Sequence, residues 1–93
     1  MPRAVEVEPQ DAELLAEVHK NASEVLRIAR KTLGERTVID CRVYFQNDKG
    51  EWRATKKGIC LRPETFAAFA DAAQSVVRRL DLKPEDYDPF GDE

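Results

Sequence analysis

Residues 37–46 carry the clearest pattern in the chain, an alternation of apolar and polar side chains among many β-branched and aromatic residues. That composition and period predict a β-strand with two different faces. The face expected to join the core comprises Ile39, Cys41, Val43 and Phe45. The face expected to meet water or a ligand comprises Val38, Asp40, Arg42 and Tyr44.

The segment that follows has the residue types of a hairpin turn, Asn47, Asp48, Lys49 and Gly50. We therefore expect residues 51–55 to return as a partner strand. Residues 57–61 should continue as another short strand, bent at Gly58, because glycine inside a strand marks a bend or bulge.

An amphipathic helix of about 18 residues is predicted from Pro63 onward. Proline is favoured in a first helical turn, and Glu64 suits the positive end of the helix dipole. The apolar stripe comprises Phe66, Phe69, Ala70, Ala73, Val76, Val77 and Leu80. One helix cannot cover both faces of a sheet, so the other face is expected to be open to a ligand.

Two N-terminal segments have less decisive patterns. Residues 10–22 indicate a short helix, in which Asp11 caps a stripe of Leu14, Leu15 and Val18. Residues 24–33 fit a helix, with glycine following as a C-terminal cap, and they also fit a strand with alternating faces. The local pattern alone favours the helix.

With 93 residues, of which 42% are hydrophobic and 35% charged, the chain suits one small folded domain. It has no apolar run near the ~20 residues of a membrane span, and its start lacks the apolar core of a signal peptide. We expect an intracellular protein without a membrane partner, which is cytoplasmic and nucleoid-associated if it is bacterial or viral, and nuclear if it is eukaryotic.

The net charge of −3 conceals a segregation of charge along the chain. Residues 20–80 carry thirteen Lys and Arg against seven acids, whereas residues 1–19 carry one base against five acids and residues 81–93 one base against six. A polyanion would be attracted to the middle and repelled by the ends.

Catalytic and metal-binding chemistry has no support in the sequence. No Ser-His-Asp set, paired-His site or phosphate-cradling glycine loop is present. Cys41 and Cys60 lack neighbouring Cys or His, so both are interpreted as small buried hydrophobes in a reducing compartment. His19 is interpreted as a surface residue. We expect a protein that is not an enzyme, with no cofactor, no metal and no catalytic residue.

Residues 42–62 combine cations with aromatic rings. They contain six Lys or Arg, two acids and three aromatics, Tyr44, Phe45 and Trp52. Rings that stack on unpaired bases, beside cations that contact phosphates, are typical of single-stranded nucleic-acid binding.

The same region resembles the C-terminal domain of the positive-cofactor-four family of transcriptional coactivators, which bind single-stranded DNA. The motif residues are Asp40, Arg42, Tyr44, Phe45, Gly50, Lys57, Gly58, Ile59, Leu61, Pro63 and Glu64. The resemblance covers roughly residues 24–80. It implies an α+β fold of four antiparallel strands followed by one helix, assembled as a homodimer. Residues 24–33 then become the first strand, against the local helical pattern.

The expected organisation has three parts. Residues 1–22 form an acidic N-terminal extension with a short helix, residues 23–82 form the DNA-binding domain, and residues 83–93 form a disordered acidic tail.

The resemblance assigns Lys31, Arg36, Arg42 and Lys57 to basic positions and Phe45 to base stacking, whereas Leu33 stands where the family often has an aromatic residue. Strict alternation instead places Phe45 on the core face, which leaves Tyr44 as the stacking residue. From the residues themselves we add further candidate contacts: Tyr44, Trp52, Arg53 and Lys56.

The expected partner is single-stranded DNA, bound with low sequence specificity in transcription, replication or repair. RNA and melted duplex are variants of this hypothesis. The tail suggests transcription or replication proteins as further partners, and it suggests competition between the tail and DNA for the basic groove. The alternative from another class is a protein-interaction adaptor that uses the sheet and the acidic ends.

Overall fold

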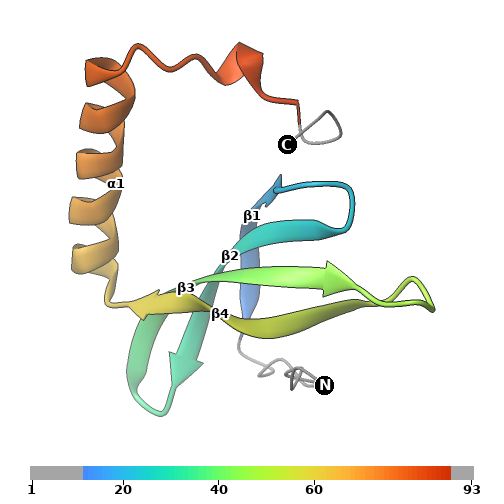
Figure 1. The fold of residues 1–93 in the computed structure, drawn as a ribbon. Coiled ribbons are helices and arrows are strands. Elements are labelled where there is room, and N and C mark those ends of the chain that lie inside the picture. Colours follow the sequence, from blue (N-terminus) through green and yellow to red (C-terminus); the bar gives the residue numbers. More distant parts are fainter. Residues whose placement is uncertain (1–11, 89–93) are drawn as a thin grey trace.

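The computed structural model describes residues 12–88, which form an α+β fold with one antiparallel sheet (Figure 1). Within these residues the four strands pair in sequence order. They are β1 (Glu13–His19), β2 (Glu24–Leu33), β3 (Arg36–Gln46) and β4 (Trp52–Leu61). The helix α1 (Pro63–Arg79) and a short 3-10 helix (Pro84–Asp86) follow. The predicted sheet with a C-terminal helix is confirmed.

The short helix predicted for residues 10–22 is wrong, because residues 13–19 form the edge strand β1. A register shift between Leu14 and Ala16 breaks the alternation of this strand. The extra residue, Leu15, makes the apolar spacing resemble one side of a helix. Cross-strand ion pairs from Glu13 and Glu17 to arginines of β2 bind this strand to the sheet.

The strand assignment of residues 24–33 is confirmed as β2, which reaches β3 through a turn with Gly34 at φ 66°. The segments 51–55 and 57–61 were predicted as two strands, but they form the single strand β4. The sheet still has four strands within residues 12–88, because β1 takes the first place.

The pairing of β3 with β4 contains an irregularity. Arg42 pairs with Gly58 and Tyr44 pairs with Ala54, so Val43 alone faces three residues, 55–57, of β4. We call residues 55–57 the β4 bulge. Where regular pairing resumes, the backbones approach so closely that a Cβ at Gly58 would lie 2.5 Å from the Cys41 carbonyl oxygen. The predicted bend at Gly58 is therefore a point where only glycine fits.

The two faces of the sheet differ in chemistry. The register places Val25, Arg27, Ala29, Lys31, Val38, Asp40, Arg42, Tyr44, Trp52 and Ala54 on one side, which we call the Tyr44 face. The opposite side, which we call the helix face, carries Leu26, Ile28, Ile39, Cys41, Val43 and Phe45. The helix face includes the four residues of β3 that were predicted as its apolar face. Cys41 is half-buried there, whereas Cys60 is exposed and not the buried residue that we expected.

The helix α1 leaves the end of β4 and stands to one side of the sheet (Figure 1). Its predicted start is confirmed, with Pro63 in the first turn and Glu64 beside the positive end of the dipole. Within the described chain no residue of α1 is buried. Phe69 is 52% exposed and Leu80 is 64% exposed, so most of the apolar stripe has no partner surface among residues 12–88.

The chain turns after α1 at Asp81, which has a φ of 53°. The tail that was predicted as disordered begins instead with the 3-10 helix, and the Tyr87 hydroxyl donates a hydrogen bond to the His19 carbonyl oxygen at the end of β1. Residues 89–93 of that predicted tail, like residues 1–11 of the N-terminal extension, lie outside the described residues.

Replacing Gly58 with alanine tests the close approach of β3 and β4. We expect Gly58→Ala to lower the free energy of unfolding by roughly 1–3 kcal/mol, because the added methyl group meets backbone atoms that cannot move away cheaply. Urea unfolding at one protein concentration measures the change. Gly34→Asn is the control, because asparagine tolerates a positive φ and nothing lies within 4 Å of a Cβ there. Equal stability of both variants would contradict the close approach.

Candidate nucleic-acid interface

One end of the Tyr44 face closes over an aromatic cluster. The rings of His19 on β1 and Trp52 on β4 meet edge to face, with centroids 6.3 Å apart. Three strand spacings separate the outer strands, roughly 14 Å in a flat sheet, so the sheet curls toward this face. Val25, Tyr44 and Ala54 are buried beneath, with Trp52 packed against them. The sequence interpretation placed His19 on the surface without a role, whereas the curl brings it into this cluster.

Arg27 covers the ring of Tyr44. Its guanidinium carbon lies 4.6 Å from the ring centroid, and its Nε donates to Glu17 at 2.8 Å. Tyr44 is only 7% exposed, so Trp52, which is half-buried, is the more accessible of the two predicted stacking residues on this face. Sequence reasoning missed Arg27. The signal was its place opposite Arg42, which is visible only once residues 24–33 are paired as a strand.

Two of the predicted phosphate-binding residues, Lys31 and Arg42, meet at Asp40. This carboxylate is 3% exposed. Arg42 donates to it through Nε at 3.0 Å and Nη2 at 2.8 Å, and the Lys31 Nζ lies 3.2 Å away. The sequence did not reveal that both cations share one buried anion, because Lys31 and Asp40 are nine positions apart.

The remaining predicted cations lie at the margins of the sheet. Lys56 and Lys57 are exposed in the β4 bulge, and neither has an ion-pair partner among residues 12–88. Arg36 is exposed at the start of β3. Arg53 is paired with Glu51 at 2.9 Å, and it is opposite Phe45 on the helix face. The structure thus brings Lys31, Arg42, Tyr44 and Trp52 together on the Tyr44 face, and it separates Phe45 and Arg53 from them.

Comparison with family models gives a match to Transcriptional Coactivator p15 (PC4) over residues 20–72, more than half of the chain. The chain belongs to the PC4 family. The resemblance inferred from the motif residues of β3 and β4 is therefore confirmed, and family membership suggests nucleic-acid binding or a transcription cofactor role.

Solved structures of a bacterial PC4 homologue share the fold. The tetragonal crystal form of BPSL1147, a PC4 homologue from Burkholderia pseudomallei, is 26% identical, with a TM-score of 0.65 over 70% of this chain and 96% of that one. The orthorhombic form is 25% identical, with a TM-score of 0.69 over 77% and 97%. No curated protein sequence matches the chain.

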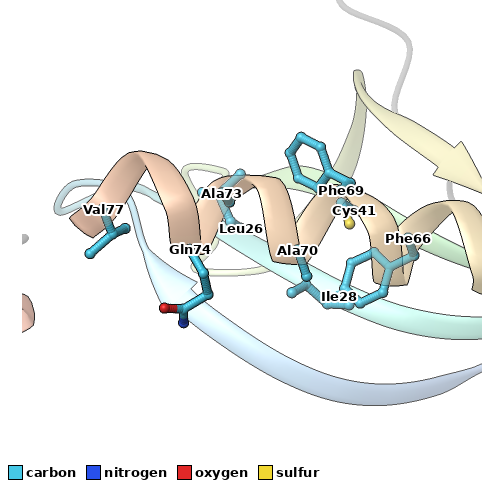
Figure 2. A pocket seen from close by; sticks show the side chains of 9 residues that line it. All are labelled: Leu26, Ile28, Cys41, Phe66, Phe69, Ala70, Ala73, Gln74 and Val77. Carbon is cyan, nitrogen blue, oxygen red and sulfur yellow. The ribbon is translucent and has the colours of Figure 1, made fainter. Parts of the chain in front are cut away.

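This PC4-family chain has a second concave feature on the helix face. A groove between α1 and the sheet is lined by apolar side chains and by Gln74, with Phe66 and Phe69 of the helix facing Leu26, Ile28 and Cys41 (Figure 2). Its lining carries no charge. The groove therefore suits an apolar protein surface and offers nothing to a phosphate.

Residues 12–88 contain no group of three side chains that could hold a metal ion. In the same residues no helix is long and apolar enough to cross a membrane. Burial raises the pKa of the Cys41 thiol, helped by the charge of Asp40, so this cysteine is not an activated nucleophile.

The ionisation of Asp40 links the site to stability. Burial alone would raise its pKa, but hydrogen bonds from Arg42 and the charges of Lys31 and Arg42 outweigh burial, so the pKa is below its ordinary value. A carboxyl group whose pKa is lower in the folded state than in the unfolded state stabilises the fold at pH values above the unfolded-state pKa, about 3.9. That stabilisation is lost as pH falls through the folded-state pKa.

We expect Asp40→Asn to lower the free energy of unfolding at pH 7 by roughly 1–3 kcal/mol, because two half-buried cations lose their anion. The gap in unfolding free energy between Asp40→Asn and the unchanged chain should narrow as pH falls from about 4, the ordinary aspartate value, through the lower pKa of folded Asp40. Denaturant unfolding at several pH values measures the gap. The control Asp48→Asn, in the exposed hairpin turn, should have nearly the same free energy of unfolding as the unchanged chain. A gap for Asp40→Asn that is independent of pH would contradict the ion pairing.

Proposed function

We propose that this PC4-family chain is a homodimer that binds single-stranded DNA on the Tyr44 face with little sequence preference. The observation that carries this proposal is that one strand, β4, bears an accessible ring, Trp52, and two exposed cations, Lys56 and Lys57, that form no ion pair within residues 12–88. A base can stack on the ring only if it is unpaired, which favours single strands over duplex.

We infer the path of the bound DNA from the direction of β3. This β-strand of 11 residues runs from Arg36 to Gln46, close to Trp52, and spans roughly 33 Å at about 3.3 Å per residue. We infer that phosphates contact Arg36, Lys56 and Lys57 along this length while bases stack at the Trp52 end. Two residues of the predicted DNA-binding set, Phe45 and Arg53, are on the helix face and would then contribute less to DNA binding.

A second copy of the chain is the partner that best fits the helix face. An isolated 17-residue helix gains little stability from its own propensity and depends on packing of its apolar side. Here most of that side is exposed, and the groove beside it is mainly apolar. A symmetric dimer would bury both helices and leave both Tyr44 faces open for DNA.

The binding proposal is tested by fluorescence anisotropy of a labelled strand of ~20 nucleotides, its RNA equivalent and the matching duplex across a salt series. We expect the single DNA strand to bind more tightly than the duplex, with affinity falling as salt rises. Equal, weak binding to all three would reject the proposal and favour the adaptor alternative. Preference for the RNA strand would change the proposed ligand from DNA to RNA but keep the Tyr44 face as the binding surface.

Two substitutions separate the contributions to binding. Lys57→Gln should flatten the plot of log affinity against log salt by about 0.7 for one phosphate contact of a single strand. Trp52→Ala should cost roughly 1–3 kcal/mol of binding free energy at every salt concentration, whereas Trp52→Phe should keep most of it. Lys83→Gln is the charge control, since that lysine is paired with Asp81 beyond α1. A change in the control equal to that in Lys57→Gln would contradict a specific contact.

Substitution in α1 tests the dimer. Phe69→Glu places a charge in the apolar groove and should convert the dimer to monomers with a lower melting temperature, as measured by light scattering and thermal unfolding. Ala68→Glu adds the same charge outside the apolar stripe and should leave the dimer intact. A chain that is monomeric at all protein concentrations before substitution would reject the dimer.

A further inference from the structure

The β4 bulge leaves backbone groups without regular partners, and two side chains take their place. Val43 has no register partner in β4, and its carbonyl oxygen accepts a hydrogen bond from the Thr55 hydroxyl at 2.7 Å. The same hydroxyl accepts from the Lys57 amide at 3.1 Å. One hydroxyl thus uses both its donor and its acceptor capacity to fix the bulge on both sides.

Arg42 fixes the bulge from a third direction. Its Nη1 donates to the Thr55 carbonyl oxygen at 3.0 Å, while Nε and Nη2 hold the buried Asp40. A planar guanidinium with this bidentate anchor presents its remaining nitrogen in one direction. The position of the bulge is therefore tied to a carboxylate on the neighbouring strand.

We propose that Thr55 and Arg42 are positioning residues, which hold the β4 bulge so that Lys56 and Lys57 reach adjacent phosphates of one strand. This inference rests on the proposed binding of single-stranded DNA and assigns the geometry of that same site. In the absence of the two anchors, the bulge would keep its charges but would spread them over many conformations. Ordering it again on binding would then cost conformational entropy.

A substitution that changes no charge gives the decisive test. Thr55→Val keeps the shape and removes the hydroxyl, and we expect it to flatten the salt dependence of single-strand binding by about 0.7 to 1.4, the value of one or two phosphate contacts. Thr55→Ser keeps the hydroxyl and should retain the original slope. Thr65→Val, at an exposed position of α1, is the matched control. Circular dichroism verifies that each variant is folded.

Arg42→Lys provides an independent second variant. Lysine keeps the charge but cannot hold Asp40 with two nitrogens while bonding the Thr55 carbonyl. If Arg42 acts only as a phosphate ligand, Arg42→Lys keeps the slope, whereas a positioning role predicts a flatter slope like that of Thr55→Val. Amide hydrogen exchange at Lys57 should also become faster in Thr55→Val, and this measurement needs no DNA.

The outcomes distinguish the two levels of the proposal. If the unchanged chain does not bind single strands, the proposed function fails. If it binds and Thr55→Val has the same slope, the positioning role is overturned. If Thr55→Val does not fold, Arg42→Lys decides, because an unchanged slope there overturns the role and a flatter slope supports it.

Discussion

The buried Asp40 carboxylate is the group on which the arrangement of the Tyr44 face depends. It lies between Lys31 and Arg42, and Arg42 in turn is opposite Arg27 on the adjacent strand. Without this anion, three cations would crowd a half-buried surface. Asp40 is the counterion of the cations at the centre of the face, and the exposed Lys56 and Lys57, which form no ion pair within residues 12–88, lie at its margin. The same anion also anchors the guanidinium that bonds the β4 bulge.

Sequence patterns predicted the elements whose periodicity is undisturbed. Residues 37–46 alternate regularly, and the stripe after Pro63 repeats at helical spacing, so β3 and α1 were found nearly at their true limits. The strand β1 was missed because the register shift between Leu14 and Ala16 imitates helical spacing. Irregular pairing thus removes the signal on which a period-based prediction depends.

The candidate site was predictable in composition and only partly in geometry. Motif residues identified the strands that carry Arg42 and Trp52, but their surroundings depend on contacts between distant strands. His19 reaches Trp52 only because the sheet curls, and Arg27 covers Tyr44 only in the register that β2 adopts. Alternation alone predicted the place of Phe45, which the motif resemblance had assigned to stacking and which here is on the helix face.

The contact between the two edge strands has a practical consequence. Trp52 is the only tryptophan of the chain, and its ring rests against His19 from the opposite edge of the sheet. Its emission is therefore an intrinsic gauge of sheet curvature, recorded without any added label. Flattening of the sheet would separate the rings and expose the indole to water, whereas tightening would enclose it. Bending of the sheet in solution can thus be followed optically, in the unmodified protein, from one native side chain.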